Sequence, residues 1–178
     1  MAFIAGLPSN YNVLSPLAFR LDIERLPMAT FFCQSVNVPG VTLGETEQLS
    51  PLINIPVPGD KMEFDSLTAT FLIDEDLMNY IEILNWIRGL GTPEVLSEYE
   101  DLEKSSPTYN VYTNKSVRGD VLSDITLHIL TNSKNTNKEV IYRDCFPITL
   151  GEIAFDSAAD GGVIVADVTF QLRDYIIQ

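Results

Sequence analysis

Alternation of apolar and polar side chains predicts that most of this chain is β-structure. Alternate residues of a strand point to opposite faces of its sheet, so a strand buried on one side alternates in polarity. The run over 163–174 has the cleanest alternation, and prolines, glycines and asparagines punctuate the others. The predicted strands cover residues 17–26, about 30–37, 62–73, 121–129, 138–144, 150–156 and 163–174.

One segment, residues 75–90, has a strong helical period. Asp74 is a suitable N-cap, and Arg88 lies in the last predicted turn, where the helix dipole favours a cation. We expect Asn79 and a few charged residues to face solvent, and the wide apolar remainder to be covered twice, by the sheet and by an extended segment or a neighbour. The apolar positions are Leu77, Met78, Tyr80, Ile81, Ile83, Leu84, Trp86 and Ile87. A second short helix is predicted over 93–103, with an acidic outer face.

These elements predict a mainly β fold: an antiparallel β-sandwich or barrel of six to eight strands with one flanking α-helix. We expect an N-terminal arm over residues 1–16 and a single domain over 17–178, the usual number for this length. The domain carries an extended hairpin arm at 41–60 and an acidic insert at 92–107.

Two segments carry apolar residues without a pattern that would bury them in their own domain. The segment 41–60 mixes apolar residues with prolines, which is unfavourable for a central strand. A surface loop is the alternative, although twenty residues without structure are unusual in a compact domain. The candidates for contact with another subunit are Phe3, Ile4 and Leu7 of the N-terminal arm and Leu49, Leu52, Ile53, Ile55 and Val57 of the hairpin arm.

The composition is strongly acidic. Twenty-five acidic and eleven basic residues give a net charge of −14, which disfavours binding to nucleic-acid phosphates or to an anionic membrane. A soluble acidic protein is the simplest interpretation of this charge. No apolar run reaches the roughly 20 residues that a membrane span needs. We expect Cys33 and Cys145 to be buried, reduced thiols, since two cysteines make no disulfide framework.

The sequence contains no recognisable catalytic or cofactor-binding motif. His128, the single histidine, lies on the polar face of a predicted strand, and Asp124 nearby supplies no nucleophile. No cysteine, histidine or carboxylate cluster has zinc spacing, and no glycine-rich phosphate motif is present. The acidic run from Asp74 to Asp76 is explained by the start of a helix. We therefore expect no enzyme activity, no cofactor and no metal.

Several short motifs, in this order, resemble tail-tube proteins of contractile-tailed phages. Each motif is short, and the order and spacing carry the resemblance, which covers most of residues 17–178. The motifs are Leu26-Pro27, Phe32-Cys33-Gln34 leading to Val38-Pro39-Gly40, Pro58-Gly59-Asp60-Lys61, Leu67 to Phe71 followed by Asp74-Glu75 and Trp86, and Phe146-Pro147 followed by Leu150-Gly151-Glu152-Ile153.

The resemblance implies a structural virion protein that forms hexameric rings. In this family the rings stack into a tail tube, their inner sheets join into one β-barrel, and a long hairpin reaches the next ring. The implied partners are further copies of the chain, the tail sheath, and baseplate or neck proteins. DNA would pass through an acidic lumen during ejection without specific binding. The implied location is the virion tail, after assembly in the host cytoplasm.

The polar strand faces supply the candidates for the lumen. These are Arg20, Asp22, Glu24, Asp124, Asp167 and Arg173. Three alternatives to the tail tube remain open. One is a baseplate tube-initiator or a neck or terminator ring of the same fold, one is a monomeric β-sandwich binding module, and the last is a small hydrolase around His128.

Overall fold

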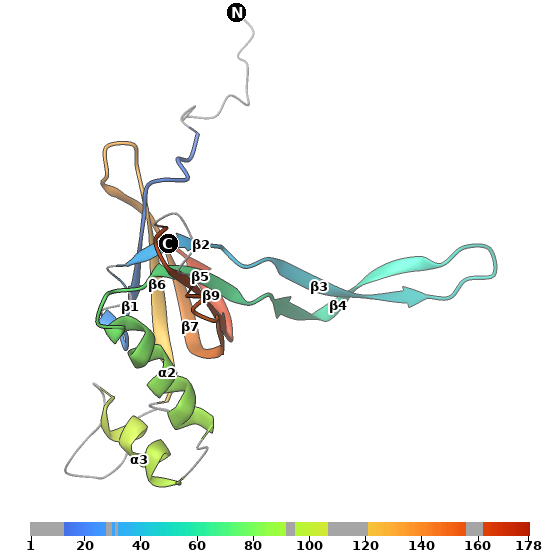
Figure 1. Cartoon of the computed structure of the whole chain (residues 1–178). Coiled ribbons are helices and arrows are strands. Elements are labelled where there is room, and N and C mark those ends of the chain that lie inside the picture. The colour runs from blue at the N-terminus through green and yellow to red at the C-terminus, as the bar shows by residue number, and fades with distance from the viewer. Residues whose placement is uncertain (1–12, 28–29, 31, 92–94, 107–120, 156–161) are drawn as a thin grey trace, which may run out of the picture.

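The computed structural model describes residues 13–27, 30, 32–91, 95–106, 121–155 and 162–178. The predicted mainly β, antiparallel fold with a flanking helix is confirmed (Figure 1). The described strands exceed the predicted six to eight because the arm is itself a pair of strands and the last predicted strand is divided. The elements are β1 (Phe19–Ile23), β2 (Cys33–Val36), β3 (Val41–Gln48), β4 (Ile55–Phe64), β5 (Leu67–Leu72), α2 (Met78–Gly91), α3 (Ser97–Lys104), β6 (Ser123–Leu130), β7 (Thr136–Leu150), β8 (Val165–Gln171) and β9 (Asp174–Ile177).

Strand β7 belongs to two sheets. Seven strands are hydrogen-bonded along the path β1-β6-β7-β8-β5-β2, and β9 also pairs with β7. The first part of β7 pairs with β6 and β9, whereas residues 146–150 pair with β8. We call β1, β6, residues 136–145 of β7 and β9 sheet A, and residues 146–150 of β7, β8, β5 and β2 sheet B. All of these pairings are antiparallel.

The passage of β7 from one sheet to the other occurs at Asp144. This residue has φ 51°, a left-handed conformation that is uncommon outside glycine but tolerated by aspartate. Its backbone N–H donates to Oδ1 of Asp124 over 3.0 Å, and its carboxylate forms an ion pair with Arg173. Side chains from β6 and from the segment after β8 therefore hold the bend in place. A strand that changes sheet at such a bend makes the corner of a sandwich.

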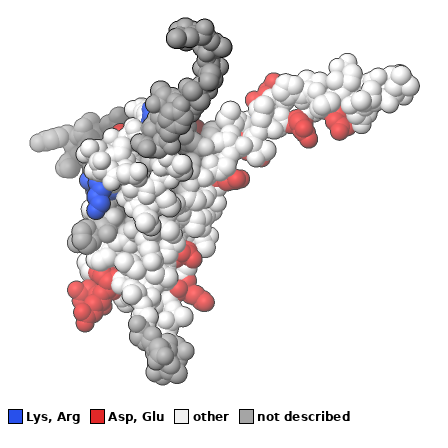
Figure 2. All heavy atoms as spheres, turned by 90° about the horizontal axis from the view of Figure 1, so that it is seen from above, with Lys and Arg blue, Asp and Glu red and all other residues white. Residues whose placement is uncertain are grey.

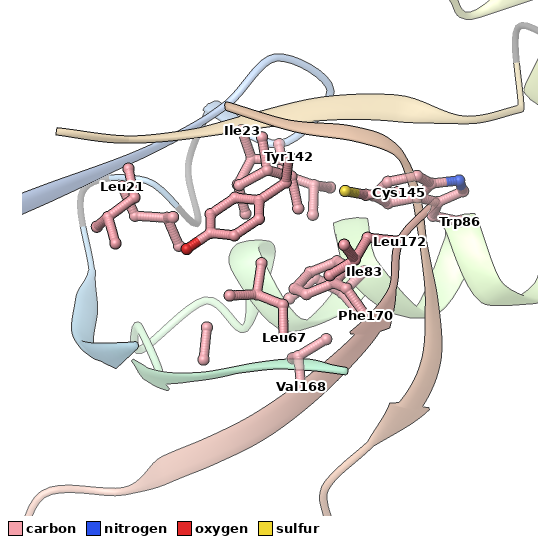
Figure 3. Packing of buried hydrophobic residues seen from close by; sticks show 14 of the residues in the cluster. Leu21, Ile23, Leu67, Ile83, Trp86, Tyr142, Cys145, Val168, Phe170 and Leu172 are labelled. Atoms are coloured by element: carbon pink, nitrogen blue, oxygen red, sulfur yellow. The ribbon is translucent and has the colours of Figure 1, made fainter. Parts of the chain in front are cut away.

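The core lies between the two sheets and is closed on one side by α2 (Figure 3). Leu21, Ile23 and Tyr142 of sheet A face Leu67 and Phe170 of sheet B, and all five are buried. Trp86 of α2 lies against Phe170, with ring centroids 6.1 Å apart, and its Nε1 donates to the Val121 carbonyl over 2.8 Å. Alternation of apolar and polar residues in the strands thus places one apolar face of each sheet inside.

Helix α2 begins later than the sequence predicted. It also turns a different side toward the interior of the chain. Leu77 has φ 57°, which an α-helix cannot include, so the turn that begins at Asp74 precedes the helix. Asn79 was expected in solvent, and this is wrong: it is 1% exposed, and its Nδ2 donates to the Leu72 carbonyl over 2.6 Å. Ile81 and Leu84, expected to be covered, are exposed on this chain.

Two predicted strands near the C-terminus also differ from the structure. A strand over 150–156 is wrong, because the pairing of β7 ends at Leu150 and residues 151–155 form no strand. The Gly151 N–H donates to the Asp167 carbonyl over 2.7 Å as the chain leaves the sheet. The predicted strand 163–174 is divided into β8 and β9 at Leu172 and Arg173, where its pairing partner changes from one part of β7 to the other.

The contact between α2 and α3 depends on a glycine. A Cβ built on Gly89 would lie 2.8 Å from Cβ and Cδ2 of Leu102, whereas one built on Gly91 meets nothing within 4 Å. We predict that Gly89→Ala lowers the free energy of unfolding by about 1–3 kcal/mol through overpacking. Gly91→Ala is the matched control and should leave stability unchanged or slightly raised. Urea unfolding of both variants measures this, and equal stability would contradict the packing described here.

Candidate assembly surfaces

The hairpin β3–β4 is the largest part of the described chain that lies outside the sandwich. It projects sideways from the body (Figure 1), and its two strands pair only with each other. Every residue of β3 is exposed. An isolated two-stranded hairpin is at best marginally stable in water, because nothing packs on its faces. The hairpin therefore has the character of an element completed by another molecule.

The root of the hairpin is fixed to the sandwich. The Tyr175 hydroxyl of β9 donates to the Pro39 carbonyl over 3.1 Å, and its ring meets the edge of Phe64 with centroids 5.4 Å apart. Tyr175 also packs edge-on against the buried Tyr142, with centroids 5.8 Å apart. This aromatic series connects the first pairs of the hairpin to the core, so the direction of the arm is set by sheet A.

A break in register divides the hairpin into two halves. The register shifts between Leu43 and Glu45, and a Cβ on Gly59 would lie only 2.6 Å from the Gly44 carbonyl oxygen. Glycine is needed here because the two backbones approach so closely. On the root side of the break, Leu43 pairs with Met62, and both side chains are exposed on one apolar face.

The outer half of the hairpin exposes apolar side chains at its tip. The structure leaves four of the five predicted contact residues of the arm exposed, with Leu52 at 95% and Leu49 at 83%, and Val57 half-buried. Sequence reasoning missed Val41, Leu43 and Met62 at the root, although their alternation with polar neighbours was visible. Phe3, Ile4 and Leu7 lie outside the described residues.

Prolines protect one edge of the hairpin. Pro56 pairs with Glu47, and Pro58 pairs with Glu45. A proline has no N–H, so the outer edge of β4 lacks donors that an added strand would need. Acidic side chains stand at intervals along the arm (Figure 2), which further opposes unspecific pairing between arms. The two faces, the tip and the outer edge of β3 thus remain open for contact.

The outer face of sheet B contains no cation. Its strands have a single charged residue, Asp167, and no lysine, arginine or histidine. Asp167 accepts a hydrogen bond from Thr70 Oγ1 over 2.7 Å, and Thr149 and Thr169 pair on neighbouring strands. This face is therefore a hydroxyl-rich surface with one carboxylate.

The outer face of sheet A is charged and internally paired. Arg20 Nε lies 2.9 Å from Oδ1 of Asp22, and the two ring nitrogens of His128 lie 3.0 Å from Asp22 and 3.2 Å from Glu139. Near the bend of β7, Arg143 lies 4.0 Å from Asp174. Through His128 and through Arg143, these charges link neighbouring strands across the sheet.

The six predicted lumen residues do not lie on one surface. Arg20 and Asp22 lie on the outer face of β1, and the exposed Glu24 follows directly after that strand. Asp124 and Arg173 hold the bend at Asp144 and so have a structural role within the chain. The sixth, Asp167, is on the outer face of sheet B. The structure brings the first five together on the side of sheet A and separates the last.

Sheet B has two unpaired edges in the described part of the chain. Strand β2 ends the path and pairs only with β5. Residues 146–150 of β7 pair with β8 on one side alone, since the pairing of β6 with β7 ends at Cys145. Free strand edges invite pairing with another chain.

Sequence comparison finds a phage tail protein. No protein-family model matches the chain. The tail tube terminator protein of Enterobacteria phage T4 is 31% identical over 108 residues, which make up 59% of this chain and 52% of the phage T4 protein. This chain thus spans about half the length of that relative.

Comparison with solved structures finds tube and terminator proteins of contractile injection systems that have a similar fold. A chain of the sheath–tube complex of the PVC extracellular contractile injection system has a TM-score of 0.64 at 14% identity, covering 94% of this chain and 93% of that one. The tube-terminating cap of the anti-feeding prophage has a TM-score of 0.61 at 13% identity, covering 100% and 99%. The PVC sheath/tube terminator has a TM-score of 0.58 at 16% identity, covering 96% and 99%. This chain has the tube and terminator fold. The resemblance to tail-tube proteins seen in the sequence is confirmed.

In this tube and terminator fold, the insert carrying α3 forms a groove with α2. The groove has a volume of about 500 Å³ and runs along Arg25, Trp86, Arg88 and Asp101. Arg88 pairs with Glu98 over 3.1 Å, and the Arg25 guanidinium lies 5.6 Å from the Trp86 ring centroid. The Arg88–Glu98 ion pair joins α2 to α3, and Arg25 also donates to the Leu102 carbonyl of α3. Charged side chains of the groove therefore help to hold the insert against α2.

The described residues contain no metal-binding cluster. Within them, no group of three histidine, cysteine or carboxylate side chains is placed to hold a metal ion. No helix among them has the length and apolar character needed to cross a membrane. The named relatives are tube and terminator proteins.

Both cysteines are free thiols of low reactivity. Cys145 is buried as expected, but Cys33 is only partly so. Burial raises the pKa of the Cys33 thiol to about 11, and burial together with the carboxylates of Asp124 and Asp144 raises that of Cys145 to about 12. The thiolate is the reactive form, so raised pKa values slow alkylation.

We predict that neither Cys33 nor Cys145 is alkylated by iodoacetamide in the folded protein at pH 8, and that both are alkylated in urea. At pH 8 a thiol of pKa 11 is thiolate in only about one molecule in a thousand. Mass spectrometry of intact protein counts the adducts. Rapid labelling of the folded chain would show that the thiols are more accessible than the packing allows.

Proposed function

We propose that this chain is a tube terminator of a contractile tail, a structural protein whose copies form a ring on the end of the tail tube. The observation that carries the proposal is sheet B, which has two open edges and an outer face without cations. Similarity to the phage T4 tail tube terminator and to two terminators of known structure supports the choice of the terminator over other tube-fold proteins.

The two open edges of sheet B suit closure into a ring. Strand β2 is antiparallel to β5, β5 to β8, and β8 to residues 146–150 of β7. The two edge strands are therefore antiparallel to each other. In a ring, β2 of one copy meets residues 146–150 of the next, and antiparallel pairing continues without interruption. Such a head-to-tail contact produces a closed ring when a whole number of copies, each rotated by the same angle, completes a full turn.

The outer face of sheet B then lines the channel. Lysine and arginine bind phosphates and hold nucleic acid, so a conduit for DNA needs a lining without them. Asp167 contributes one negative charge per copy, and the threonines are neutral. Of the six residues proposed for the lumen from sequence, this arrangement keeps Asp167. It places the charged outer face of sheet A away from the channel.

We infer that the ring has six copies, that it contacts the tail tube and the sheath or neck, and that it acts in the virion tail after assembly in the host cytoplasm. The exposed hairpin extends this interaction to a neighbouring subunit. The chain has no role as an enzyme in this proposal, and it needs no cofactor.

A main tail-tube subunit is the second candidate. The sheath–tube complex of the PVC system has a TM-score of 0.64, above those of the two terminators. A tube subunit would stack into long tubes by itself, whereas a terminator would stop at a ring. A chain of an anti-feeding prophage baseplate, with a TM-score of 0.52 and 11% identity, keeps a tube-initiating ring as a further outcome.

Light scattering and negative-stain microscopy of the purified chain over a range of concentrations separate these functions. We expect rings with a central hole that do not elongate. Long tubes would favour the main tube subunit. A monomer at every concentration would contradict ring formation and favour a binding module.

We predict that Ile148→Lys weakens ring formation without unfolding the chain. Ile148 is 51% exposed at the bulge of the open β7 edge, so a lysine there is tolerated in the monomer but places a charge at every junction of the ring. The dissociation constant of the ring should rise by about tenfold or more, since a tenfold change needs only about 1.4 kcal/mol. Sedimentation velocity measures this effect.

Thr136→Lys is the matched control, because Thr136 is the exposed first residue of the same strand and lies in sheet A; this variant should form rings normally. Normal rings from Ile148→Lys would exclude the β7 edge from the junction.

A further inference from the structure

His128 of β6 lies between carboxylates of two other strands. Its Nε2 is 3.0 Å from Oδ2 of Asp22 on β1, and its Nδ1 is 3.2 Å from Oε1 of Glu139 on β7. The register of sheet A pairs His128 directly with Glu139 on one side and with Arg20 on the other. We call Asp22, His128 and Glu139 the histidine bridge, because together they connect three neighbouring strands through their side chains.

Both contacts of the bridge are attractive only when the imidazole carries two protons. A neutral imidazole has one N–H donor, and its other nitrogen is an acceptor. An ionised carboxylate also only accepts, so a neutral ring directs a lone pair toward either Asp22 or Glu139. The imidazolium donates from both nitrogens and attracts both carboxylates. The His128 side chain is 22% exposed, so water screens these contacts only in part.

The charged groups that face the imidazole favour its protonated form. On β1 these groups are Asp22 and Arg20, whose Nε lies 2.9 Å from Oδ1 of Asp22, and on β7 the group is Glu139. The two carboxylates outnumber the one guanidinium, so a second proton on the ring makes the four side chains neutral together. Arg20 alone opposes that proton, and its charge is already offset by Asp22.

The other charges on this side of sheet A lie away from the bridge. Lys138 pairs with Ile129, which packs against the core, so it belongs to the opposite face from Glu139. Gln178 exchanges two backbone hydrogen bonds with Glu139 and has no charged side chain. The remaining charged residues bond to one another at the bend of β7: Asp124, Arg143, Asp144, Arg173 and Asp174.

The geometry points to a pH-sensitive contact within sheet A. We propose that His128 joins β1 to β7 while its ring carries two protons, and that the loss of one proton breaks the bridge on one side. Strand β1 is the end of the sheet and pairs only with β6 among the described strands. The bridge therefore adds a side-chain connection that reaches past β6. This inference concerns the single chain and does not depend on ring formation.

The sign of the pH dependence follows from the proton that the bridge holds. The folded chain keeps two carboxylates beside the ring, whereas unfolding separates them, so the folded state binds this proton more tightly. The bridge stabilises the fold where the ring is protonated and Asp22 and Glu139 are ionised. Its contribution is lost as the pH rises and the ring becomes neutral.

Nitrogen NMR of the ¹⁵N-labelled chain tests the bridge directly, since one histidine gives one set of ring signals. At pH 6.5, where a histidine without partners is about half neutral, we expect mainly the doubly protonated ring. Asp22→Asn and Glu139→Gln should each lower the proton affinity of the ring about threefold or more. Asp167→Asn, which removes a carboxylate from the outer face of sheet B, is the control and should leave the titration unchanged.

Urea unfolding at several pH values gives a second readout. The wild type should be more stable than His128→Gln at pH 5.5, and this difference should fall by at least half at pH 8.5. The two thiols do not interfere, because burial raises the pKa of Cys33 to about 11 and that of Cys145 to about 12. A ring that is mainly neutral at pH 6.5, a titration insensitive to both carboxylate variants, or a stability difference independent of pH would overturn the proposal.

Discussion

The structure depends on the bend of one strand. Because β7 turns at Asp144, a single strand pairs with β6 and β9 in its first part and with β8 in its second. Without this turn the seven strands would form one open sheet with an exposed apolar face. With it they enclose a core that α2 can close. The cost of a left-handed residue is offset by the backbone bond to Asp124 and the ion pair with Arg173.

The same bend determines which strand edges of sheet B remain unpaired. The pairing of β7 with β6 ends at the corner, so residues 146–150 of β7 have one unpaired strand edge. Strand β2, at the other end of sheet B, has a second unpaired edge. The chain between β2 and β5 continues outward as the hairpin, which has no cover of its own. A closed sandwich core thus coexists with unpaired strand edges and with an arm that packs on no other described element. A structural subunit of an assembly has this combination, and a self-contained binding module does not require it.

Sequence patterns predicted the strands and the fold class because alternation reflects burial on one side of a sheet. They also located the projecting arm, since prolines among apolar residues exclude a central strand. They were wrong where contacts between distant residues or local backbone geometry determine the structure. Leu77 has a left-handed conformation, so α2 begins after it, and a buried hydrogen bond holds the Asn79 side chain in the interior. The bend at Asp144 has no periodic signal in the sequence. The lumen candidates were chosen by polarity alone, which cannot tell the outer face of sheet A from that of sheet B.

Hydrogen–deuterium exchange over residues 41–64 tests the central claim most directly. Exchange is followed by mass spectrometry on the dilute monomer and on the concentrated assembly. The hairpin has only its own ladder in the monomer, so its amides should exchange fast there and become strongly protected on assembly, while the core strands are protected in both. A hairpin equally protected in the monomer, or unprotected in an assembly that does form, would contradict the account of an arm completed by its neighbour.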